Sequence, residues 1–137
     1  MILFEKLKWK NILSTGNAFT EVALNNHKTS LIVGENGAGK STILDALCFV
    51  LYGKPFRKIN KTQLLNSING KGLVVEIDFK VGKRQYHIKR GIKPNLFEIY
   101  VDGTLLDQLS DVREYQDMLE KQILKLNYRS FSQIVIL

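Results

Sequence analysis

The 137-residue chain carries a formal net charge of +7, and 45% of its residues are hydrophobic. This size permits one domain with a real core, and no apolar run is long enough to span a membrane. A single cysteine excludes a disulfide scaffold and a cysteine zinc site. We expect Cys48 to be a packed core thiol in a reducing, cytoplasmic setting, and we expect no signal peptide.

The positive charge is concentrated in the middle of the chain. Residues 54–93 hold 11 basic and 2 acidic side chains, whereas residues 94–137 hold 4 basic and 7 acidic ones. This distribution predicts a surface for a polyanion, with nucleic acid the first candidate, against the alternative of a solvated basic face. The candidate DNA contacts are Lys83 and Arg84 beside one predicted hairpin turn, with Lys54, Arg57, Lys58 and Lys61 as the rival patch.

Residues 1–13 alternate in polarity, which predicts a half-buried strand with Leu3, Leu7 and Trp9 on its inner side. A turn signal follows, and residues 18–24 read as a second strand. An antiparallel pair is therefore expected before residues 29–33, whose β-branched composition predicts a buried strand.

The motif at residues 34–41 organises the chain. Gly34, four further residues, Gly39, Lys40 and Ser41 fit the P-loop pattern, placed between a predicted strand and a predicted helix. Glycines allow successive backbone amides to converge on one anion, and the helix adds the positive end of its dipole. The alternative is a glycine-rich turn before an ordinary helix.

Each part of this loop has a predicted role in binding Mg-ATP. Lys40 is expected to neutralise the β- and γ-phosphates, which makes it the candidate catalytic residue, and Ser41 to hold Mg²⁺. The remaining predicted contacts to the nucleotide come from Asn36, Gly37, Ala38, Gly39 and Thr42.

The rest of the chain alternates further elements. Residues 41–52 predict a helix that ends at Gly53, and residues 61–66 predict a short one. An antiparallel meander is expected over about 73–105, and an amphipathic helix over about 111–126. Within the meander the strands are predicted at 73–81, 84–91 and 96–101, and a last apolar strand is predicted at the end of 130–137.

These residues together resemble the N-terminal half of an SbcC-type, SMC-like DNA-repair ATPase head, above all the branch from T-even-like bacteriophages. The resemblance covers essentially the whole chain. It is carried by residues 7–14, the P-loop, residues 44–47, 51–57, 86–91 and 93–99, and Ser130 with Phe131 before the final apolar run.

The resemblance implies an α/β P-loop NTPase fold, the N-terminal lobe of an ABC-type ATPase head with an added antiparallel meander. It implies an ATPase subunit that uses ATP binding and hydrolysis to control a partner nuclease in DNA double-strand-break repair. The implied cofactors are ATP and Mg²⁺. The implied partners are double-stranded DNA, an SbcD-type nuclease, a second head and the C-terminal half of the same head, in the host cytoplasm if the gene belongs to a phage.

In such heads a coiled coil leads to the second half, which supplies the signature motif and the acidic strand end; neither sequence occurs in this chain. The chain alone is therefore expected to be inactive, and the family's Mg-sensing glutamine to lie beyond Leu137. Two alternatives stay open: a non-hydrolysing nucleotide- and DNA-binding fragment, and a transporter-type ATPase subunit.

Overall fold

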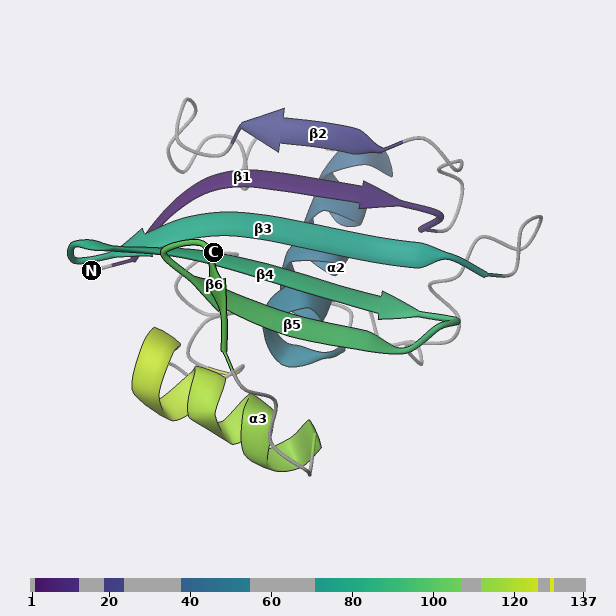
Figure 1. The fold of residues 1–137 in the computed structure, drawn as a ribbon. Helices are drawn as coiled ribbons and strands as arrows, with labels where there is room; N and C mark the ends of the chain where they lie inside the picture. Colours follow the sequence, from purple (N-terminus) through teal and green to yellow (C-terminus); the bar gives the residue numbers. More distant parts are fainter. Residues whose placement is uncertain are drawn as a thin grey trace.

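The structure is a computed structural model that describes residues 2–12, 19–23, 38–54, 71–106, 112–125 and 129. Its centre is one six-stranded sheet in which every neighbouring pair of strands is antiparallel, in the order β2-β1-β3-β4-β5-β6 (Figure 1). The strands are β1 Ile2–Lys10, β2 Thr20–Ala23, β3 Leu73–Val81, β4 Arg84–Ile92, β5 Leu96–Val101 and β6 Thr104–Leu105.

The two faces of the sheet differ because side chains alternate along each strand. The inner face packs in the core, and its fully buried members come from four neighbouring strands. The outer face carries the intervening polar side chains, such as Lys8, Glu76 and Lys89, which lie side by side across three strands. The inner set is Leu7, Leu73, Val75, Ile77, Phe79, Ile88 and Ile99.

One prediction for the first strand is wrong. Leu3 is 52% exposed, whereas Leu7 and Trp9 are buried as predicted. A register irregularity between Phe4 and Lys6 inserts one extra residue against β3, which indicates a β-bulge. The bulge turns Phe4 toward Phe79, with ring centroids 5.8 Å apart, and leaves Leu3 on the outer side.

Helix α2 (Ala38–Tyr52) crosses one face of the sheet (Figure 1). It starts three residues earlier than predicted, so that Gly39 lies inside its first turn. From Leu44 to Tyr52 every residue is buried, and the helix packs against β1, β3 and β4. Burial on all sides explains why this segment is apolar apart from Asp45, which is buried as well.

The helix ends as predicted at Gly53, which adopts φ 78° and donates its amide to the Phe49 carbonyl oxygen at 2.8 Å. The meander turns likewise use residues with positive φ. Gly82 has φ 61°, and Asp102 and Gly103 have φ 51° and 87°, as a type I′ hairpin turn requires.

Helix α3 (Val112–Met118) continues directly as the π-helix η2 (Leu119–Leu124), where residues 111–126 were expected to form one amphipathic helix. The Tyr115 hydroxyl accepts the Ile99 amide at 3.1 Å and donates to the Leu106 carbonyl at 3.4 Å. This pair of bonds fixes α3 beside β5, where Figure 1 shows it at one margin of the sheet. Lys125 ends the element with φ 55°.

Several predicted elements lie outside the described residues: the strand at 29–33, the short helix at 61–66 and the final strand within 130–137. Within the described part, no helix is both long enough and apolar enough to cross a membrane.

Candidate nucleotide-binding site and the pocket at the end of its helix

The described part of the P-loop motif forms the first turn of α2. The helical backbone begins at Ala38 and runs through Gly39, Lys40, Ser41 and Thr42. The first amides of a helix have no partner within it, and together with the helix dipole they favour an anion at this end. This turn can therefore serve as one wall of a phosphate site, which is where the motif places it.

The other predicted site residues are distributed as follows. Asn36, Gly37, Arg57, Lys58 and Lys61 lie outside the described residues. Lys54, Lys83 and Arg84 are exposed, the first just after α2 and the other two at the turn between β3 and β4.

Behind its first turn, α2 is buried in the core from Leu44 onward. Cys48 is fully buried, and burial raises the pKa of its thiol to about 12, with a smaller contribution from the charge of Asp45. The expected packed core thiol is confirmed, since a buried neutral thiol is chemically inert. Trp9 is also buried, in agreement with the prediction that it packs in the sheet.

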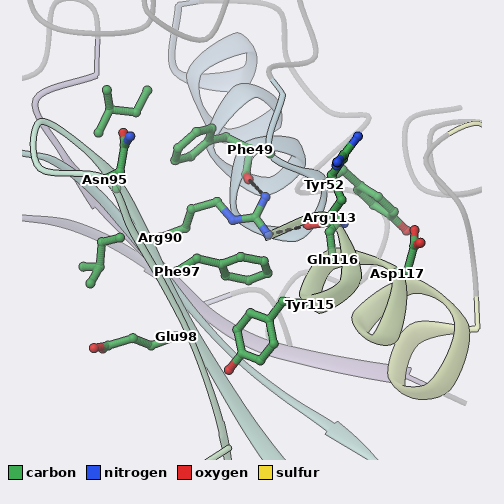
Figure 2. Close-up of a pocket in the computed structure, with 14 residues that line it drawn as sticks. Phe49, Tyr52, Arg90, Asn95, Phe97, Glu98, Arg113, Tyr115, Gln116 and Asp117 are labelled. Atoms are coloured by element: carbon green, nitrogen blue, oxygen red, sulfur yellow. Dashed lines mark hydrogen bonds between the residues drawn. The ribbon is translucent and has the colours of Figure 1, made fainter. Parts of the chain in front are cut away.

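A pocket of about 740 Å³ lies at the opposite, C-terminal end of α2 (Figure 2). Its walls come from the end of α2, from β4 and β5, and from α3. Aromatic side chains and a few polar ones line it together, among them Phe49, Tyr52, Arg90, Phe97, Tyr115 and Gln116.

Arg90 joins three of these walls. Its Nη1 donates to the Phe49 carbonyl oxygen of α2 at 3.3 Å, and its Nη2 donates to Oε1 of Gln116 on α3. Its Cζ lies 3.6 Å from the centroid of the Phe97 ring on β5. Figure 2 shows the guanidinium between the helix end and the Phe97 ring, where cation–π attraction adds to the hydrogen bonds.

Gln116, on α3, is the second residue of this contact, and we call Arg90, Gln116 and the end of α2 the Arg90 junction. Its Nε2 donates to the Leu51 carbonyl oxygen at 3.0 Å and to Oε2 of Glu120 at 2.8 Å. Arg90 and Gln116 thus both bind carbonyl groups of the last turn of α2. The Phe49 carbonyl also accepts the Gly53 amide, and Gln116 supplies a donor for the Leu51 carbonyl near the end of the helix. Gly53 leaves room for this arrangement, because a Cβ there would lie 2.5 Å from Nη1 of Arg90.

Burial lowers the pKa of the Arg90 guanidinium to about 9, while the charge of Glu120 acts in the opposite direction. The group therefore remains charged at neutral pH. This role of Arg90 was not predicted from the sequence. The available signal was the alternation of β4, which places Arg90 on the same face as Ile88 and Ile92.

The middle of the outer sheet face is electrically mixed. His87 lies between two carboxylates, with Nδ1 2.7 Å from Oδ1 of Asp78 and Nε2 3.0 Å from Oε1 of Glu76. Lys89 lies across from Glu76 on one side and Glu98 on the other. The basic excess of the hairpin is thus greatest at its turn, at Lys83 and Arg84.

Comparisons with known proteins identify the family of the chain. A family model described as an AAA domain matches residues 6–137. The chain is 46% identical over 132 residues to Exonuclease subunit 2 of Enterobacteria phage T4, covering 96% of the chain and 23% of that protein. It is 33% identical over 132 residues to the DNA double-strand break repair Rad50 ATPase of Thermoplasma acidophilum, covering 90% of the chain and 14% of that protein.

Solved structures show the same fold. The Smc head domain of Pyrococcus yayanosii matches with a TM-score of 0.59 and 25% identity over 88% of this chain and 25% of that one. A structure from work on ATP-driven dimerization and DNA-stimulated activation of SMC ATPases matches with a TM-score of 0.59 and 21% identity, over 94% of this chain and 83% of that one. The predicted fold class, a P-loop NTPase head lobe with an antiparallel meander, is confirmed. The chain spans less than a quarter of the length of these two curated relatives.

The junction at Arg90 yields a stability prediction. Arg90→Met should lower the free energy of unfolding by about 1–3 kcal/mol, because the Phe49 carbonyl and Gln116 lose a charged donor inside the protein. Arg84→Met, on the exposed start of the same strand, is the matched control and should change stability by less than about 0.5 kcal/mol. Urea denaturation followed by circular dichroism measures both, and equal midpoints for the two variants would contradict the assigned role.

Proposed function

The chain belongs to the AAA domain family as an SbcC-type ATPase segment, and from that premise we propose that it binds ATP for a DNA double-strand-break repair or recombination exonuclease. In the full-length subunit, ATP binding and hydrolysis would control a partner nuclease on DNA. This activity would belong to the whole protein, and the chain would supply its nucleotide-binding part.

The single observation that carries the nucleotide proposal is the start of α2 within the motif. The helix begins at Ala38, so the backbone of Gly39, Lys40 and Ser41 forms its first turn. In this arrangement Lys40 would neutralise the β- and γ-phosphates, Ser41 would hold Mg²⁺, and Thr42 would add a hydroxyl near the α-phosphate. Asn36, Gly37 and Ala38 would contribute backbone contacts to the phosphates.

Mg-ATP binding should depend on Lys40. Lys40→Ala removes one charge-assisted contact, which corresponds to a loss of about 1.5–3 kcal/mol in binding free energy. Isothermal titration with Mg-ATP measures the affinity. Lys121→Ala removes one exposed positive charge from η2 and is the matched control; if Lys40→Ala binds as tightly as this control, the P-loop assignment is wrong.

We propose that double-stranded DNA is a partner and that it meets the basic turn between β3 and β4. Support comes from the exposure of Lys83 and Arg84 and from the concentration of basic residues at 54–93. Lys54 with Arg57 and Lys58 remains the rival contact. Arg90, on the same hairpin, is not part of this basic surface because its side chain is buried.

Changing Lys83 and Arg84 to Glu should weaken binding to all duplex sequences alike. Two lost phosphate contacts lower the slope of log affinity against log salt by about 1.8. Fluorescence anisotropy with one duplex at several salt concentrations gives this slope. The same reversal at Lys54 and Arg57 tests the rival patch; an unchanged slope in the first variant and a lowered one in the second would move the contact there.

We propose that ATP turnover requires partners: the C-terminal half of the head, a second head and an SbcD-type nuclease in the cytoplasm of the bacterial host. Hydrolysis needs a positioned water and charge compensation beyond the γ-phosphate, in addition to a P-loop. A non-hydrolysing nucleotide- and DNA-binding fragment is the second candidate function, because the sequence holds the P-loop without a signature motif.

Purified chain should therefore release phosphate from ATP no faster than its Lys40→Ala variant. Adding the C-terminal half from the same gene should produce DNA-stimulated turnover. Steady-state phosphate release, with the Lys40 variant as the contamination control, distinguishes the cases. Turnover by the chain alone that disappears in this variant would show that the catalytic groups reside within these 137 residues.

A further inference from the structure

The outer face of the sheet holds an exposed aromatic ring between two lysines at its β2 margin. Phe19 directly precedes β2 and is 43% exposed. Lys8 and Lys10 lie on β1 with buried Trp9 between them, so alternation directs both lysines to the outer face. Their Nζ atoms lie 4.8 Å and 5.1 Å from the centroid of the Phe19 ring.

This cluster is separate from the basic turn between β3 and β4. It lies at the β2 margin of the sheet, whereas β3 and β4 are central strands. We propose that Phe19, Lys8 and Lys10 form a contact for single-stranded DNA, an inference that rests on the DNA partner of the proposed function.

The charges at the cluster favour a polyanion. Lys8 Nζ lies 3.8 Å from Oε2 of Glu76, a single long ion pair that leaves further donors of the ammonium group for another acceptor. Neighbouring Lys6 pairs in the same way with Glu21 at 3.9 Å. Lys10 has no carboxylate within 4 Å among the described residues, so the uncompensated charge is greatest there. Two ammonium groups beside one ring can bind the phosphates of a nucleic-acid backbone.

The exposed Phe19 ring favours single-stranded DNA over duplex DNA as the ligand. Unpaired bases stack on exposed aromatic side chains of a sheet surface, while the bases of a duplex already stack on each other. An exposed ring flanked by cations can bind a base and its neighbouring phosphates together. A duplex would use the lysines alone.

The test measures binding of a fluorescently labelled oligo-dT and of a duplex to the 137-residue chain by anisotropy. Phe19→Ala should weaken oligo-dT binding about tenfold. Phe19→Leu should bind oligo-dT as weakly as Phe19→Ala, because leucine keeps apolar area and loses the π-face. Phe19→Trp, which keeps an aromatic ring, should bind as tightly as the wild type. Leu105→Ala, equally exposed at the opposite margin of the sheet, should leave affinity unchanged.

The lysines have their own matched control. Lys8→Gln combined with Lys10→Gln should lower the salt slope for oligo-dT by about 1.4, the value for two phosphate contacts to a single strand. Lys121→Gln combined with Lys125→Asn removes the same charge from exposed sites on η2 and at its end, and Asn suits the positive φ of Lys125. This control should not alter the slope.

The outcomes separate this inference from the function on which it rests. A Phe19→Leu protein with wild-type thermal stability and weakened oligo-dT binding supports the contact over a merely structural role. Two results would overturn this inference alone. One is that the chain binds duplex DNA while the Phe19 and lysine variants keep the wild-type affinity for oligo-dT. The other is that Phe19→Ala loses equal affinity for both DNAs. No binding of either DNA overturns the DNA partner too, while Mg-ATP titration still tests the P-loop independently.

Discussion

The buried end of helix α2 is the constraint on which the rest of this structure depends. A helix leaves its last carbonyl groups without partners inside the helix, and here the residues of the last turn are buried. Donors from other elements therefore add to the one that the chain supplies at Gly53. The Gly53 amide and the Arg90 guanidinium serve the Phe49 carbonyl, and Gln116 serves that of Leu51. The last turn of α2 is thereby tied to β4 through Arg90 and to α3 through Gln116.

A buried guanidinium is costly, and its surroundings show how the cost is offset. Arg90 donates two hydrogen bonds, stacks on Phe97 and lies in the field of Glu120. The two ends of α2 are thereby specialised in opposite ways. At the C-terminal end protein donors bind the Phe49 and Leu51 carbonyls, whereas the N-terminal turn contains Gly39 and Lys40 of the P-loop motif. A helix anchored at one end can present its other end to an anion without reorganising.

Local patterns predicted most of the meander. The strands at 73–81 and 96–101 begin and end where alternation and turn residues placed them, and the strand from residue 84 is longer by one residue. These elements combine period-two polarity with Gly82 and Asp102-Gly103, whose turn geometry is local. What failed depends on long-range contacts. The bulge in β1 depends on the register with β3, and the change from α3 to the π-helix η2 leaves no periodic pattern in the sequence.

For the site, the P-loop motif predicted the start of α2 to within three residues. The contacts of Arg90 with α2 and α3 join residues that are distant in sequence, and a local sequence motif cannot predict such contacts.

The hydroxyl of Tyr115 limits the pairing of β5 with a strand from another molecule. β6 is only two residues long, and beyond it the backbone of β5 would offer donors and acceptors to a strand from another molecule. Tyr115 occupies the Ile99 amide, and the Leu106 amide occupies the Ile99 carbonyl at 2.8 Å. Both polar groups of this residue are thus committed within the chain. At Ile99 this margin of the sheet is therefore closed to a strand from another molecule, by one aromatic side chain from a helix and one backbone amide.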